Sequence, residues 1–206
     1  MKAATTPQEK IDLLALHKTE YAAPKKPVLV ETKPATYLSI TGIGQPGDTS
    51  FGAQIGALYS VAFTIKMTRK FSGKMDYTIC KLEARWPELP ANDKSKPWKW
   101  ELLIRTPDFV SPEELAAAAR KLIEKGQSPE VNAVRLTKLD EGPCVQLLHV
   151  GPYAEEARTC ATMLAFADSK GFAPAGFHHE IYFSDPRRVP PERLRTILRQ
   201  PVKKKA

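Results

Sequence analysis

The chain has 206 residues, of which 42% are hydrophobic and 26% are charged. This is enough apolar material for one large domain, or two small fused units, with a real core. No run of 18 apolar residues occurs and residues 1–26 lack a signal peptide, so we expect a cytoplasmic protein without a membrane span. Three cysteines without CxxC spacing, Cys80, Cys144 and Cys160, are predicted to be reduced and mostly buried.

The net charge of +8 is unevenly distributed along the chain. Residues 185–206 hold eight Lys and Arg against two acids, which leaves a net charge of about +2 for the rest. Nucleic-acid-binding proteins usually spread basic residues along one folded face. We therefore predict a solubilising basic tail at residues 203–206 and no specific nucleic-acid partner. An acidic partner or a phosphate surface is the alternative.

The first half of the chain begins with β-rich runs and then alternates helical and extended patterns. Residues Ile55, Leu58 and Ile65 recur at helical spacing. Ser111 is a good N-cap and Glu114 completes a capping box. The expected strands are 28–32, 35–41, 76–86 and 98–105, with a Pro-rich loop at 87–97, and the expected helices are 51–68 and 111–126.

The second half shows a similar order of signals. We expect strands at 133–139, 144–150 and 178–184, a helix at 154–169 stopped by Gly171, and a last short helix from Pro191.

Two internal matches indicate a repeat. Residues 100–115 match residues 179–194 at an offset of 79, with six of sixteen positions identical, and residues 33–42 match residues 142–151 at an offset of 109. The matches occur in the same order, so we infer two copies of one module. The predicted fold class is α+β, with antiparallel strands and helices on one face. Its parts are an N-terminal extension at 1–27, module one at about 28–126 and module two at about 131–202.

Alternation along the strands predicts which side chains face the helices. In residues 98–105 the apolar set, which includes Trp98 and Trp100, is expected under the helices. The repeat alignment equates this set with His179, Ile181 and Phe183, which puts His178, Glu180, Tyr182 and Ser184 on the face away from the helices. Glu101 and Tyr37 belong to the corresponding face of module one. Two modules related by a pseudo-twofold axis would turn these faces toward a shared cleft.

Glu180 is a carboxylate in the middle of an apolar strand, and three roles are open for it. It could attract a cation among aromatic rings, act as a general base on a water, or pair with Arg187 or Arg188 at the edge of the sheet. Adjacent His178 and His179 point to opposite faces of a strand, so no metal site is expected. Nucleotide-binding fingerprints are absent, and no cofactor is predicted.

Other aromatic residues divide between core and pocket. Trp98 and Trp100 are expected in the core, whereas Trp86, at a strand end, is the better pocket candidate. Tyr59 fits either a core stripe or a pocket wall equally well. His149 is expected to be structural.

Residues 176–202, GFHHEIYFSDPRRVPPERLRTILRQPV, resemble the C-terminal signature of stand-alone GyrI-like small-molecule-binding proteins. Four more runs are similar to other blocks of that family, in the family's order: GALYSVAFTIKM, DYTICKLEARW, WKWELLIRTPDF and LLHVGPYAEE. The resemblance covers about residues 10–202 and implies tandem SHS2-type modules. Two departures stand out. Where the family usually has L-E-G-L-W-W, this chain has LEARWP at residues 82–87, so the second tryptophan is missing. Phe63 stands at a position where the family commonly has Tyr.

The resemblance implies a protein that binds lipophilic, aromatic, often cationic small molecules in a cleft between modules, either to sequester or to sense them. The residues expected to bind the ligand are Glu180, Tyr182, Glu101, Trp86, Tyr59 and Tyr37. The alternative is a hydrolase that opens cyclopropane-bearing electrophilic natural products with Glu180 as general base. The missing tryptophan favours binding without turnover. The oligomeric state is left open.

Overall fold

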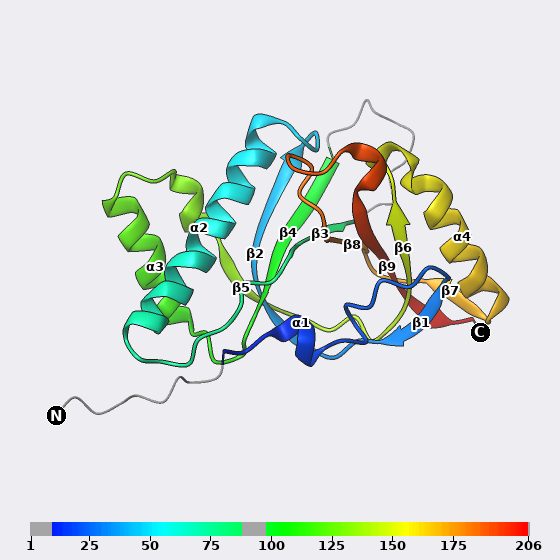
Figure 1. Ribbon diagram of the computed structural model, residues 1–206, viewed down its shortest axis with the longest axis horizontal. Coiled ribbons are helices and arrows are strands. Elements are labelled where there is room, and N and C mark those ends of the chain that lie inside the picture. Colours follow the sequence, from blue (N-terminus) through cyan, green and yellow to red (C-terminus); the bar gives the residue numbers. More distant parts are fainter. Residues whose placement is uncertain (1–9, 88–97, 206) are drawn as a thin grey trace.

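A computed structural model describes residues 10–87 and 98–205 of the chain (Figure 1). Within these residues there are four helices: α1 (Leu13–Leu16), α2 (Thr49–Phe71), α3 (Pro112–Glu124) and α4 (Glu156–Ser169). The strands are β1 (Val28–Glu31), β2 (Ala35–Gly44), β3 (Leu82–Trp86), β4 (Trp98–Thr106), β5 (Arg135–Leu139), β6 (Pro143–Val150), β7 (Phe172–Pro174), β8 (His178–Tyr182) and β9 (Arg195–Lys204). Short 3₁₀ turns cover Pro129–Ala133, Tyr153–Glu155 and Pro191–Arg193. The predicted Pro-rich loop lies outside the described residues, except for Pro87.

The strands form one antiparallel sheet in the order β1-β6-β9-β8-β3-β4-β2-β5, and β7 pairs with β9. Helices α2 and α4 pack on the same side of this sheet, and α3 packs beside α2 (Figure 1). The predicted α+β class with an antiparallel sheet is therefore confirmed. None of the helices within the described residues is long and apolar enough to cross a membrane.

The strand order reveals two modules that meet at the β3–β8 pair. Each contains an outer strand, a helix, an inner strand and a middle strand: β2, α2, β3 and β4 in one, and β6, α4, β8 and β9 in the other. The match between 33–42 and 142–151 agrees with this arrangement, because it pairs β2 with β6. The match between 100–115 and 179–194 is wrong as a structural equivalence. It aligned β4 with β8, whereas the counterpart of β8 is β3 and the counterpart of β4 is β9.

Each module is extended by an edge strand from the other half of the chain. Strand β1, near the start of the chain, pairs with β6 of the second module. Strand β5, which follows α3, pairs with β2 of the first module. The halves of the chain are therefore interlocked.

The predicted helix after Pro191 is wrong. A single 3₁₀ turn is followed by the ten-residue strand β9, whose residues 196–202 are buried and whose residues 196–199 lie between β6 and β8. Alternating apolar residues and the β-branched Thr196 and Ile197 favour an extended chain here. Lys203 and Lys204 pair with β7, so two of the four residues of the predicted basic tail belong to the sheet.

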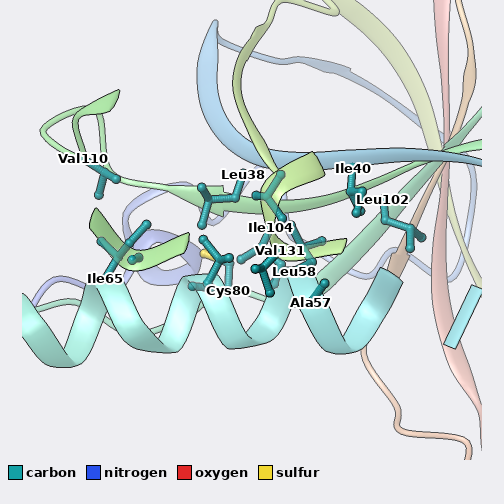
Figure 2. Packing of buried hydrophobic residues seen from close by; sticks show 14 of the residues in the cluster. Leu38, Ile40, Ala57, Leu58, Ile65, Cys80, Leu102, Ile104, Val110 and Val131 are labelled. Carbon is teal, nitrogen blue, oxygen red and sulfur yellow. The ribbon is translucent and has the colours of Figure 1, made fainter. Parts of the chain in front are cut away.

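Most of the apolar core lies between the sheet and the two long helices. Under α2, residues of β2, β3 and β4 pack against the helix in one cluster, whose members include Leu38, Ile40, Leu58, Ile65, Leu102 and Ile104 (Figure 2). A smaller cluster under α4 includes Val145, Leu147, Met163 and Leu198. The three cysteines are free and buried, as predicted.

The placement of α2 and α3 depends on two local features of the sequence. Ser111 and Glu114 form the predicted capping box at the start of α3. Gly42 is a position where no side chain fits, because a Cβ atom there would lie 2.4 Å from Gln54 Oε1 and 2.5 Å from Trp100 Nε1. Those two atoms are joined by a 2.7 Å hydrogen bond. Gly42 therefore permits this bond between α2 and β4.

The second face of the sheet is covered by the N-terminal segment. Residues 10–27, which the sequence analysis set apart as part of an extension, pack there through Tyr21, which is buried against Ile181 and Ile197. Of the predicted strand 76–86, only β3 is a strand, while Tyr77 forms an isolated bridge with Ile11.

Candidate functional site

Glu180 lies on the helix-covered face of the sheet, and the prediction that it faces away from the helices is wrong. Its neighbours across the adjacent strands are Ala84 of β3 and Leu198 of β9, which belong to the clusters under α2 and α4. The error follows from the false alignment of β4 with β8. That alignment assigned the odd-numbered residues of β8 to the helix face, whereas the even-numbered residues lie there. Glu180 thus lies where the two modules meet.

The carboxylate of Glu180 is buried, with 7% of the residue exposed. Its Oε2 accepts a 2.6 Å hydrogen bond from the Tyr182 hydroxyl, and its Oε1 lies 3.6 Å from His178 Nε2. Within the described parts of the chain it has no Lys or Arg partner within 4 Å. Arg187 and Arg188 pair with Asp185 instead, so the sheet-edge alternative does not hold.

The start of α4 and the 3₁₀ turn before it carry more titratable groups whose pKa values respond to Glu180. Burial, followed by the negative charge of Glu180, raises the pKa of Glu156 to about 9. Burial and the same two carboxylates raise the pKa of Tyr153 and of Cys160 to about 12. The Tyr153 ring also contacts the edge of Tyr182, with centroids 5.9 Å apart. The neutral forms of these groups are favoured around Glu180.

Trp86, at the end of β3, is 4% exposed and belongs to the cluster under α2. Its ring stacks on Phe51 at 6.3 Å and meets the edge of Trp98 at 5.6 Å. Tyr59 of α2 is half-buried and packs against the same cluster. The core placement of Trp100 is confirmed, and Trp98 packs at the margin of that core. His149 is structural, since it bonds to Thr159 and to the Pro152 carbonyl.

The structure does not bring Glu101 and Tyr37 together with Glu180. Glu101 lies on the second face of the sheet and accepts a 2.6 Å hydrogen bond from Arg85. Tyr37 is 3% exposed on that same face, in a small cluster with Leu103. Glu180, Tyr182 and Trp86 share the helix face, and Tyr59 lies on the helix that covers it.

Sequence reasoning missed Glu156, Tyr153 and Thr196. Thr196 lies opposite Tyr182 in the β8–β9 register, on a segment that was expected to be helical. Glu156 begins the buried stripe of α4, which continues through Cys160, Met163 and Ala167. An acid in register with such an apolar stripe is a signal that could have found it.

The described residues also form two surface hollows away from Glu180. One lies between α2 and α3 beside Phe63 and Phe71, and the other lies beside His149 and Arg158. Within residues 10–87 and 98–205, no three His, Cys, Asp or Glu side chains are grouped as ligands for a metal ion.

Comparison with known proteins places this arrangement in a family. The family model "GyrI-like small molecule binding domain" matches residues 103–203. A hydrolase encoded by lin2189 from Listeria innocua is 34% identical, with a TM-score of 0.87 over 95% of this chain and 100% of that chain. The chain belongs to the GyrI-like small-molecule-binding family. An uncharacterized conserved protein from Listeria innocua is 36% identical, with a TM-score of 0.86 over 94% of this GyrI-like chain and 100% of its own.

A more distant structure shares only the fold of this GyrI-like protein. The C-terminal domain of EcmrR has a TM-score of 0.57 and 13% identity over 87% of this chain and 98% of that chain. No match was found among functionally curated proteins.

The departures from the GyrI-like sequence pattern can now be placed. Arg85 lies on the second face and pairs with Glu101, so it does not enter the surroundings of Glu180. Pro87, where the pattern has its second tryptophan, is exposed just after β3. Phe63 is 53% exposed on α2.

Proposed function

We propose that this GyrI-like protein binds lipophilic, aromatic, often cationic small molecules at Glu180, in a cleft between the two modules, and thereby sequesters or senses them. The observation that carries the proposal is a buried carboxylate with no Lys or Arg partner among the described residues. A buried charge without a cationic partner is costly. A ligand cation supplies that partner, and the nearby rings of Tyr182 and Tyr153 suit a cation as well.

The test compares two Glu→Gln variants of the full chain. In Glu180→Gln, the affinity for rhodamine 6G, a lipophilic cationic dye, should fall about 10- to 150-fold, which corresponds to about 1.5–3 kcal/mol for a charge-assisted contact. The affinity for Nile red, a neutral aromatic dye, should change much less. Glu101→Gln is the matched control, because it removes the same charge from the opposite face.

Fluorescence titration of both dyes measures these affinities. An equal loss for both dyes in Glu180→Gln would assign Glu180 to the fold and not to the ligand charge. No loss for either dye would remove Glu180 from the site altogether.

A second candidate function is hydrolysis, and the pair Glu156 and Glu180 favours it. An acid whose pKa is about 9 stays protonated at neutral pH beside a second carboxylate, which is the pairing that general acid and general base catalysis needs. Relatives from Listeria innocua that are 34–35% identical are described as hydrolases.

For a cyclopropane fused to a conjugated carbonyl, the chemistry is as follows. Water attacks a cyclopropane carbon while Glu180 takes a proton from it. The strained C–C bond breaks, its electron pair moves onto the conjugated carbonyl, and the carbonyl oxygen takes the proton of Glu156. The product is the ring-opened hydrate.

Product analysis by mass spectrometry separates the two functions. For a hydrolase, Glu180→Gln and Glu156→Gln should each slow hydrate formation by roughly 10²–10⁴-fold, while Glu101→Gln should not. Stoichiometric binding of the intact electrophile, with no hydrate after prolonged incubation, would leave only the binding function.

A further inference from the structure

Buried polar atoms without hydrogen-bond partners gather around Glu180. They include Trp86 Nε1 and His178 Nδ1, and also Glu156 Oε1 and Thr196 Oγ1, which lie within hydrogen-bonding reach of each other. Proteins leave few buried polar groups unpaired, and each such group calls for an explanation. Two of them, on Trp86 and His178, lie on residues that are directly opposite each other in the β3–β8 register. Side chains at opposite positions of adjacent strands share one face and lie close together.

The chemistry of these two atoms is fixed by their surroundings. The Trp86 indole nitrogen is a donor only. His178 Nε2 faces the Glu180 carboxylate at 3.6 Å, which is beyond hydrogen-bond distance, but the negative charge there favours the tautomer with the proton on Nε2. His178 Nδ1 then carries a lone pair and is an acceptor. A donor and an acceptor are thus carried by directly opposite residues of neighbouring strands.

Neither group is free to turn toward another partner. The Trp86 ring is held between Phe51 and Trp98, and the His178 ring is 2% exposed beside Glu180. Both unpaired atoms are closed to solvent, so a ligand reaches them only when neighbouring side chains move. Pairing both atoms offsets that rearrangement, because an unpaired buried group is unfavourable.

We propose that Trp86 and His178 form a subsite for a secondary amide or lactam edge of an aromatic ligand. The ligand carbonyl accepts a hydrogen bond from Trp86 Nε1, and the ligand N–H donates one to His178 Nδ1. The inference rests on the proposed small-molecule binding at Glu180 and names the ligand group that this site selects.

The test uses two planar probes of the same shape. In 2-quinolinone an N–H lies next to the carbonyl, whereas in coumarin a ring oxygen replaces that N–H. The native chain should bind 2-quinolinone about tenfold more tightly, because coumarin places a lone pair against His178 Nδ1. Isothermal titration calorimetry measures both affinities, and this comparison requires no variant to fold.

Variants assign the preference to the two residues. Trp86→Phe keeps an aromatic ring and should lower the affinity for both probes about tenfold, while the ratio of the two affinities is retained. His178→Leu should abolish the ratio, and His178→Asn, which keeps an acceptor near the position of Nδ1, should restore part of it. Glu101→Gln should leave all of these values unchanged.

Equal affinity of the native chain for the two probes would overturn the subsite. If rhodamine 6G still binds in a Glu180-dependent manner in that case, the proposed function stands without the subsite. If neither probe and no dye binds, the proposed function fails together with it.

Discussion

The two faces of the central strand β8 carry neighbouring histidines in opposite states of pairing. His178, on the helix face, has one long contact to Glu180 and an unpaired Nδ1. His179, on the second face, lies 2.9 Å from Glu83 and 3.0 Å from Glu141. On the second face these charged side chains lie within 4 Å of opposite charges on other segments, whereas on the helix face the described residues bring no Lys or Arg within 4 Å of Glu180. This contrast separates a face that fixes the fold from a face that has interactions left to offer a ligand.

The second-face network also secures the N-terminal segment. The Arg199 guanidinium, 1% exposed, contacts Glu141 at 3.4 Å and donates to Gln146 Oε1 and to the Glu20 carbonyl. The Glu20 carboxylate pairs with Arg105 at 2.8 Å, and the Tyr21 hydroxyl donates to Glu83 at 2.8 Å. Residues of β3, β4 and β9 are thereby tied to the segment that covers them.

The largest loss of stability should come from replacing His179, when it is compared with the same replacement at His178. His179→Leu leaves Glu83 and Glu141 as buried charges without this partner and should lower the free energy of unfolding by about 3–5 kcal/mol. His178→Leu removes a side chain with little pairing and should cost less than about 1 kcal/mol. Urea denaturation measures both. Similar costs for the two variants would erase the distinction between the faces.

A smaller effect is expected from Glu141 in acid. Burial acts to raise the pKa of Glu141, but the charges of His179, Arg199 and Arg85 outweigh it and lower this pKa to about 2. The folded-state pKa is below the unfolded value, so the stabilisation is present above about pH 4.5 and is lost as the pH falls toward 2.

Glu141→Gln should therefore be about 2–3 kcal/mol less stable than the native chain at pH 6 and nearly as stable at pH 2. Thermal and urea unfolding between pH 6 and pH 2 would show the difference in stability between the variant and the native chain decrease. A difference that is independent of pH would mean that shape, and not charge, accounts for the role of Glu141.

An effect of the opposite sign is expected on the helix face. The pKa of Glu156 is raised to about 9, so the folded chain holds a proton that the unfolded chain releases above about pH 4.5. Stability should fall as the pH rises from 4.5 to 9. Glu156→Gln should remove this fall, because a neutral amide takes up no proton on folding, and should gain several kcal/mol over the native chain at pH 8, at about 1.4 kcal/mol for each pH unit above 4.5.

The control is the same variant at pH 4.5, where no gain should appear. A loss of stability in Glu156→Gln at pH 8 would show that Glu156 is held as a favourable partner in the free protein.

Much of the fold could be predicted from local signals. The α+β class, the helix bounded by Ser111 and Gly126, and the burial of the cysteines depend on capping chemistry and periodicity within short windows. The inverted face of Glu180 depends on the pairing of β3 with β8 across more than 90 residues, and the missed strand β9 depends on its pairing with β6 and β8. The shared turn and Pro residues of 100–115 and 179–194 occur wherever a strand ends, so they could not decide that pairing.

The candidate site shows the same division. Glu180 and Tyr182 were found because they lie within one strand. Glu156 and Thr196 join them only through the packing of α4 and β9. Glu101 was expected beside Glu180 by analogy between modules, and the register places it on the other face.

The exchange of edge strands between the halves has a consequence for fragments of this protein. A protease that cuts the turn between α3 and the 3₁₀ segment at Pro129 would separate the chain at the border of the two modules. The pieces would remain joined, since β1 from one piece pairs with β6 of the other, β5 pairs back with β2, and β3 pairs with β8. A nicked protein of this kind should migrate as one particle in gel filtration and separate only in denaturant. Either half expressed alone would expose two unpaired strand edges, which favours aggregation over independent folding.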